Sequence, residues 1–86
     1  DTMAFGACRA LREAGLRIPE DCSIIGYDGQ YYTEYMTPSL TTVVQPVAEM
    51  ARKTVELLDD AVKKKAPPVC VIYDAELRIR ESVRKI

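Results

Sequence analysis

The stretch Ser23–Gly29 (SIIGYDG) decides the fold prediction, because an apolar run ends at a carboxylate that stands between two glycines. The run from Cys22 to Tyr27 is short and largely apolar, which is typical of a buried strand in a parallel sheet. In open α/β sheets, ligands bind outside the carboxyl ends of the strands. Asp28 stands at such an end, where its carboxylate can accept hydrogen bonds from a small polar ligand. The alternative is that Asp28 only caps a turn.

An amphipathic helix is predicted before this strand, from Thr2 to Ala14. Its apolar residues recur at spacings of three and four, which predicts one buried face: Met3, Ala7, Ala10, Leu11 and Ala14. Gly15 followed by Leu16 indicates the C-terminus of this helix. Phe5 lies on the opposite face, close to Arg9, and is either part of a partner surface or an ordinary exposed apolar residue.

A loop, a second strand and a second helix are predicted next. Gln30 to Leu40 is too polar and irregular for a regular element and is expected to form a loop with at most one helical turn. Thr41 to Val44 is β-branched throughout and predicts a strand. Pro46 suits the first position of a helix, whose apolar stripe is Val47, Met50, Ala51, Thr54, Leu57, Leu58, Ala61 and Val62. The Gln45 amide either caps this helix or meets a ligand.

Two further strands are predicted near the C-terminus. Val69 to Tyr73 is apolar, and Glu76 to Arg80 alternates polar and apolar residues, which predicts one buried face. Strands and helices thus interleave along the whole chain. This order predicts an α/β fold with a mainly parallel sheet in a three-layer αβα arrangement.

Composition excludes several functions for these 86 residues. The chain has no histidine, which removes the commonest general base and metal ligand, and its net charge of −1 gives no positive field for nucleic acid. No nucleophile or catalytic carboxylate pair is indicated, so we expect neither an enzyme nor a metal or cofactor site. The three cysteines are in no metal or disulfide pattern and are expected to be small buried hydrophobes: Cys8, Cys22 and Cys70. No membrane span or signal peptide is indicated.

Motifs along the whole chain resemble the C-terminal part of lactose/galactose repressor (LacI/GalR) family regulators. In the first half the likeness lies in Asp1–Ala7 (DTMAFGA), Arg9–Asp21 (RALREAGLRIPED) and Ser23–Asp28 (SIIGYD). In the second half it lies in Thr37–Val43 (TPSLTTV), Gln45-Pro46, Met50-Ala51, Pro67-Pro68 and Glu76–Ser82 (ELRIRES). The order and spacing of these motifs are those of the family.

The resemblance implies the C-terminal portion of a type I periplasmic-binding-protein-like fold, in which three crossovers join two subdomains. Residues 1–43 are then expected in the C-terminal subdomain, residues 47–74 in the N-terminal one, and residues 76–86 back in the C-terminal one. The crossovers would lie near Val44 to Pro46 and near Asp74 to Ala75. The chain starts at Asp1 directly on a helical pattern, which we take as a cut within a longer protein.

The resemblance also implies site residues. The aspartate that Asp28 matches binds hydroxyls or ring nitrogens of a small effector, and the position of Val47 can wall the same pocket. Gln45 is the third candidate, at the end of the second strand. The family's dimer face implies a role for Phe5, Arg9, Tyr35 and Met36. In the family, an asparagine that also reaches the effector precedes the position of Asp1, and the residue after the aspartate is often polar, where this chain has Gly29.

The expected function is therefore the sensing of a sugar or small polar metabolite, and homodimerisation, in a cytoplasmic transcriptional regulator. Operator DNA would be bound through a helix-turn-helix headpiece that this chain does not include. The runner-up is a periplasmic sugar-binding protein of an ABC transporter, which shares the fold and the aspartate. A stand-alone interaction module is a third possibility, but both subdomains are represented incompletely, so we expect that these residues do not fold alone as a monomer.

Overall fold

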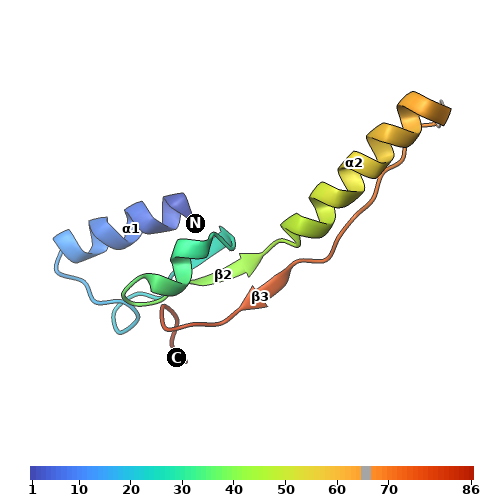
Figure 1. The fold of residues 1–86 in the computed structure, drawn as a ribbon. Helices are drawn as coiled ribbons and strands as arrows, with labels where there is room; N and C mark the ends of the chain where they lie inside the picture. The colour runs from blue at the N-terminus through green and yellow to red at the C-terminus, as the bar shows by residue number, and fades with distance from the viewer. Residues whose placement is uncertain (65–66) are drawn as a thin grey trace. The chain divides into compact units, whose positions relative to one another are not determined.

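The computed structural model describes residues 1–64 and 67–86. The elements follow one another as shown in Figure 1: α1 (Thr2–Glu13), β1 (Ile25–Asp28), the 3-10 helix η1 (Tyr31–Tyr35), β2 (Thr41–Val44), α2 (Val47–Lys64) and β3 (Glu76–Arg78). The chain divides into two compact units. The first holds Asp1–Val44 with Glu76–Ile86, and the second holds Gln45–Ala75.

The first unit is built on a three-stranded sheet in the order β1-β2-β3. β1 and β2 are parallel, and their register pairs Ile25 with Thr41 and Asp28 with Val44. β3 pairs with β2 in the antiparallel direction, so that the described sheet is mixed. The predicted strand at 41–44 is confirmed. Of the strand predicted at 76–80, only Glu76–Arg78 forms β3, and its predicted buried face is wrong because all three residues are exposed. The strand predicted at 22–27 begins later, at Ile25, and ends at Asp28.

The end of α1 follows the prediction from Gly15 and Leu16. Gly15 has a φ of 79°, which favours glycine, and its amide donates to the Arg12 carbonyl at 2.9 Å. The Leu16 amide donates to the Leu11 carbonyl at 2.9 Å. Together these two bonds form a Schellman motif, which satisfies carbonyls that the helix would leave open at its end.

The predicted buried face of α1 is wrong for the described residues. The buried residues of the helix are Ala4 and Cys8, whereas Met3 is 89% exposed. Met3, Ala7, Ala10 and Leu11 instead line an open apolar groove beside the segment 22–27. The physical reason is that β1 is the edge strand of the described sheet. No further strand lies beyond β1 in the described sheet to cover the rest of the apolar face of α1.

Polar side chains fill much of the interior of the first unit. The buried apolar residues are Ala4, Cys8, Ile18 and Leu40, and the buried polar ones are Asp1, Thr33, Thr41, Thr42 and Ser82. Within the described residues, every buried polar side-chain atom has a hydrogen-bond partner. This matters because a buried polar group without a partner costs roughly 1–3 kcal/mol. Specific hydrogen bonds therefore hold this unit as much as apolar packing does.

Ser82 joins the start of the two parallel strands. Its hydroxyl donates to the Ile24 carbonyl at 2.6 Å and accepts from the Thr41 amide at 2.8 Å. Its main chain accepts from the Ile24 amide at 2.9 Å and donates to the Ser39 carbonyl at 2.9 Å. Because the pairing of β1 with β2 begins at Ile25, Ser82 takes the place of the missing ladder bonds one residue earlier.

Arg80 fixes the chain after β3 to the same strand and to η1. Its main-chain amide donates to Thr41 Oγ1 at 2.8 Å. Its guanidinium Nη1 donates to Thr33 Oγ1 at 2.7 Å and to the Leu40 carbonyl at 2.9 Å. Thr33 and Leu40 are fully buried, so the C-terminal tail anchors the loop between β1 and β2 from the inside.

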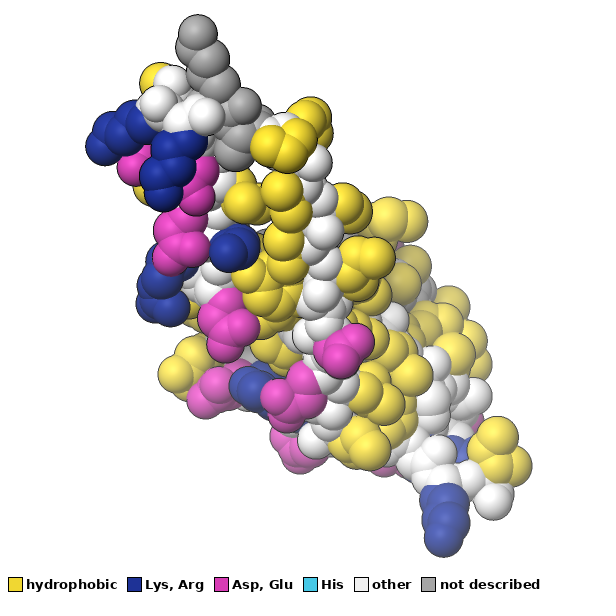
Figure 2. All heavy atoms as spheres, turned by 90° about the vertical axis from the view of Figure 1, so that its right-hand side faces the viewer, with side chains coloured by type: hydrophobic (Ala, Val, Ile, Leu, Met, Phe, Trp, Pro, Cys, Tyr) yellow, Lys and Arg dark blue, Asp and Glu magenta, His cyan; other side chains and the backbone are white. Residues whose placement is uncertain are grey.

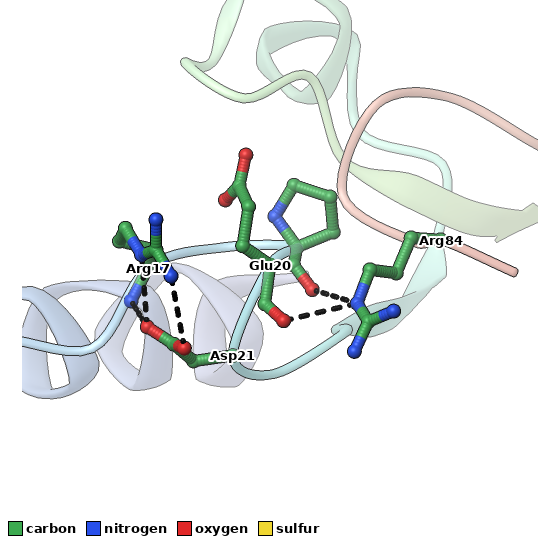
Figure 3. A network of polar contacts seen from close by, with 5 residues as sticks. Arg17, Glu20, Asp21 and Arg84 are labelled. Atoms are coloured by element: carbon green, nitrogen blue, oxygen red, sulfur yellow. Dashed lines mark hydrogen bonds and ion pairs between the residues drawn. The ribbon is translucent and has the colours of Figure 1, made fainter. Parts of the chain in front are cut away.

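The C-terminal tail also binds the turn after α1, as Figure 3 shows. Arg84 Nε donates to the carbonyl oxygens of Pro19 and Glu20 at 3.2 and 3.0 Å. In the same turn, Arg17 Nε and its main-chain amide donate to Asp21 Oδ2 at 3.2 and 2.8 Å. The side-chain bond first, and the main-chain bond second, hold the pKa of Asp21 below its ordinary value.

The second unit consists of α2 and the extended segment that precedes β3. None of the described residues of α2 is buried, so the stripe predicted as its core face is not covered here, with Val47, Leu58 and Val62 more than 60% exposed. Residues 69–73 form no strand, which corrects the prediction, because no neighbouring strand of this unit pairs with them. Figure 2 shows yellow hydrophobic side chains gathered on this face, with charged side chains along one flank.

The charged flank of α2 contains ion pairs one helical turn apart, Lys63 with Asp59 at 3.2 Å and Lys64 with Asp60 at 3.5 Å. Such exposed pairs stabilise a helix only slightly. Among the described residues, no helix combines the length and the apolar character that crossing a membrane requires.

The role of Ser82 predicts that Ser82→Ala in the full-length protein lowers the free energy of unfolding by roughly 2–4 kcal/mol, because the buried Thr41 amide and the part-buried Ile24 carbonyl lose their partner. Equilibrium urea denaturation measures this change. Ser39→Ala is the matched control, since the Ser39 hydroxyl bonds to Glu81 at the surface, and it should cost less than about 1 kcal/mol. Equal losses in the two variants would contradict the role given to Ser82.

The Arg17 bonds predict that Arg17→Met raises the pKa of Asp21 toward its ordinary value. The folded-state pKa of Asp21 is lowered, so the stability from this pair is present above the ordinary carboxyl pKa and is lost as the pH falls through the lowered value. A carbon-detected NMR titration of Asp21 in both proteins measures the shift. An unchanged Asp21 pKa in Arg17→Met would refute the assigned cause.

Candidate functional site

Asp28 ends β1 in a backbone conformation that few residues adopt. Its φ is 121°, and Gly29 follows with a φ of 75°. A non-glycine residue in such a region costs about 1–3 kcal/mol, and such residues cluster at ligand sites. Two independent features therefore point to Asp28 as a ligand-binding residue: its strained backbone and its place in the sequence at the end of a strand.

Gly29 is required by the close approach of β2. A Cβ at position 29 would lie 2.9 Å from Val44 Cα and from both Val44 methyl carbons. Since real Cβ atoms do not approach other atoms so closely, no larger residue fits without a shift of the backbone. Where the family often has a polar residue, this chain has a glycine that packs on Val44, the residue paired with Asp28 in the sheet.

Asp1 bonds to both sides of the Asp28-Gly29 pair, which the sequence reasoning missed. The Gln30 amide donates to Asp1 Oδ2 at 2.6 Å, and the ammonium nitrogen of Asp1, the first residue of this chain, donates to the Tyr27 carbonyl at 2.8 Å. Asp1 is only 9% exposed. The sequence signal was an aspartate before a helix, which indicates a cap, but its side chain makes no capping bond to α1.

Gln45 and Val47 lie in the second unit, at the start of α2, whereas Asp28 lies in the first. The Gln45 carbonyl accepts from the Val47 amide at 2.8 Å, and the Pro46 carbonyl accepts from the Met50 amide at 3.0 Å. The Val47 side chain is 64% exposed. The three effector candidates are therefore not brought together within one unit.

The candidate dimer residues share one surface of the first unit. Phe5, Tyr35 and Met36 line an apolar groove between α1 and η1, together with Thr2, Tyr31 and Tyr32. Phe5 is 55% and Tyr35 75% exposed, and the Phe5 and Tyr32 rings lie nearly perpendicular with 6.2 Å between ring centres. A second groove beside it is lined by Phe5, Arg9 and Met36, among others. This aromatic surface has the composition of a protein interface.

Arg9 and the three cysteines are the other polar groups singled out from the sequence. Arg9 pairs with Glu13 at 3.0 Å on the surface of α1. Of the three cysteines, Cys8 is buried as expected, and burial raises its thiol pKa, whereas Cys22 is half-buried and Cys70 exposed. Within residues 1–64 and 67–86, no three His, Cys, Asp or Glu side chains lie close enough to hold a metal ion.

Comparison with known proteins gives relatives of one kind. The profile of the periplasmic binding protein-like domain matches residues 1–83. The HTH-type transcriptional repressor PurR of Vibrio vulnificus (strain CMCP6) is 42% identical over 87 residues, which cover 100% of this chain and 26% of the repressor. The chain spans about a quarter of the length of the curated relatives it matches.

Two crystal structures of regulators share the fold. The LacI family transcriptional regulator from Arthrobacter sp. FB24, in complex with lactose, superposes with a TM-score of 0.85 at 35% identity, over 98% of this chain and 32% of that one. The LacI family transcriptional regulator from Enterococcus faecium, with bound ribose, gives a TM-score of 0.83 at 38% identity, over 96% and 32%.

These relatives favour the regulator over the transporter component that shares its fold, and they are regulators rather than enzymes. The match covers nearly the whole chain, from α1 through β3. The predicted α/β architecture of the periplasmic-binding-protein type is confirmed by the same superpositions. The chain belongs to the periplasmic binding protein-like domain family, in the form that LacI-type transcriptional regulators carry.

Proposed function

We propose that this chain is the effector-sensing and dimerisation segment of a DNA-binding transcriptional regulator whose effector is a sugar or a related small metabolite. The observation that carries the proposal is Asp28, an exposed carboxylate held in a strained turn at the carboxyl end of a parallel strand. A carboxylate in this position can accept two hydroxyl hydrogen bonds from a sugar. The relatives with bound lactose and ribose support this ligand class.

Gln45 and Val47 are proposed as further effector residues, and the subdomain assignment supports their role. Residues 1–43 and 76–86 are assigned to the C-terminal subdomain, and residues 47–74 to the N-terminal one. The two compact units, which divide after Val44 and after Ala75, support this assignment. The Gln45 amide would add a donor and an acceptor to the pocket, and Val47 an apolar wall.

The mechanism follows from an effector that binds one of two conformations of the regulator more tightly. Such an effector shifts the protein toward the conformation that it prefers. The difference in affinity between the two conformations sets the free energy available to change DNA binding. DNA itself would be bound by a separate helix-turn-helix headpiece, and the proposed location is the cytoplasm, where the regulated DNA lies.

The Asp28 assignment predicts that the full-length protein binds ribose or lactose and that Asp28→Asn weakens this binding at least about tenfold, which is about 1.4 kcal/mol. The amide loses the charge and one acceptor oxygen. Isothermal titration calorimetry measures the affinity. Asp59→Asn is the matched control, because Asp59 is an exposed carboxylate paired with Lys63 on α2, and it should leave the affinity unchanged.

Two results would contradict this proposal. If neither ribose nor lactose binds, the sugar class is wrong. If one of them binds and Asp28→Asn retains the full affinity, Asp28 is not an effector residue.

The aromatic surface of α1 and η1 is proposed as a homodimer interface made by Phe5, Arg9, Tyr35 and Met36. The two grooves that these residues line would each receive side chains of the partner's equivalent surface, as a two-fold interface requires. Exposed aromatic side chains in such grooves are the usual anchors of protein interfaces.

The dimer surface predicts that Phe5→Asp raises the dimer dissociation constant of the full-length protein at least about tenfold, because a carboxylate would be buried without a partner. Sedimentation equilibrium measures this constant. Lys85→Asp places an equal new carboxylate on the exposed C-terminal tail and should leave the dimer intact. A Phe5→Asp protein that dimerises as tightly as the Lys85→Asp protein would overturn the assignment.

A further inference from the structure

We propose that Asp1 is a positioning residue for the effector site, and that it acts by holding the turn that presents Asp28. This inference rests on the proposed effector role of Asp28. The side chain and main chain of Asp1 bond to the main chain on either side of the turn and to Thr42 of β2.

The main-chain contacts of Asp1 enclose Asp28 and Gly29. Asp1 Oδ2 accepts from the Gln30 amide at 2.6 Å, and the ammonium nitrogen of Asp1, the first residue of this chain, donates to the Tyr27 carbonyl at 2.8 Å. Asp28 has a φ of 121°, which strains a non-glycine residue, whereas Gly29 has a φ of 75°, which glycine adopts readily. Hydrogen bonds on either side of the turn help to hold the strained residue in place. Asp1 holds both ends with one residue.

The other carboxylate oxygen fixes Asp1 to the sheet. Thr42 Oγ1 donates to Asp1 Oδ1 at 2.5 Å, and Thr42 is fully buried in β2. A Cβ at Gly26 of β1 would collide with the same Oδ1 and would lie 2.8 Å from Leu40 Cδ2. The glycine at position 26 therefore makes room for the carboxylate against the strand that Asp28 ends.

The main-chain carbonyl of Asp1 completes the connection, because it accepts from the Phe5 amide at 2.8 Å in the first turn of α1. One buried residue thus ties together α1, the end of β1, the turn after it and β2. A buried carboxylate is tolerated only where its oxygens are hydrogen-bonded, and here both are. Ordinary helix capping would leave this carboxylate local to α1, but its bonds run to residues about 30 and 40 positions away.

The test compares three variants of the full-length protein by two measurements. Amide hydrogen exchange at Gln30, without any sugar, reports whether the turn is held, and calorimetry with ribose or lactose reports the affinity. Asp1→Ala removes both acceptor oxygens, so the Gln30 amide should exchange at least about tenfold faster and the sugar affinity should fall at least about tenfold.

Asp1→Asn and Thr42→Val separate positioning from mere stability. In Asp1→Asn, the amide oxygen can still accept from the Gln30 amide, so exchange and affinity should stay within about threefold of the unaltered protein. Thr42→Val removes only the bond to Oδ1. It should lower the melting temperature while the Gln30 amide stays protected and the affinity stays within about threefold.

The outcomes separate this inference from the proposed function. If Asp1→Ala leaves either the Gln30 exchange or the affinity unchanged, or if Asp1→Asn or Thr42→Val reduces the affinity as much as Asp1→Ala does, the positioning role is overturned. If the effector role of Asp28 is wrong, Asp28→Asn keeps the full sugar affinity. The exchange of the Gln30 amide is measured without sugar, so it tests the role of Asp1 in holding the turn independently of that result.

If Asp1→Ala does not fold, amide hydrogen exchange in the unaltered protein tests whether Asp1 holds the turn. The hydrogen bonds of η1 begin with the Thr33 amide, which donates to the Gln30 carbonyl, so the Gln30 amide owes its protection to Asp1. It should then exchange at least about tenfold more slowly than the Tyr31 amide, and equal exchange would overturn the proposal.

Discussion

The four hydrogen bonds of Ser82 are the interaction on which the first unit depends. They connect the C-terminal tail to Ile24, Ser39 and Thr41 at the place where the two parallel strands begin to pair. Parallel strands far apart in the sequence have no turn to set their register. With few apolar side chains buried around them, the register of β1 and β2 is set by a residue that follows them by about 40 positions or more.

The register then determines the site. Pairing that starts with Ile25 opposite Thr41 ends with Asp28 opposite Val44, so the turn at the end of β1 comes against the last residue of β2. A slip by one residue would invert every side chain of β1 and turn Asp28 to the other face. The C-terminal motif Glu76–Ser82 therefore helps to set the face of the sheet on which the Asp28 carboxylate lies.

Local elements were predictable from this sequence, and burial was not. Periodicity, β-branching and a glycine at a helix end depend on neighbouring residues, so α1, β2 and α2 appear where expected. The apolar stripes of both helices are largely exposed, and residues 69–73 form no strand. Burial and strand pairing depend on which other elements pack against a segment, and a local sequence pattern does not contain that information. Asp28 could be found from its place after a strand, whereas the contacts of Asp1 join residues too distant for any local pattern.

The contact between Gly29 and Val44 has a consequence for protein engineering and for divergence among relatives. Position 29 offers the shortest route to a new ligand contact beside Asp28, yet any side chain there meets Val44 first. Libraries that randomise position 29 alone would return mostly glycine. To change the ligand preference at this turn, positions 29 and 44 would have to be randomised together. A residue smaller than valine at position 44 has to come first, because only then is there room for a larger residue at position 29.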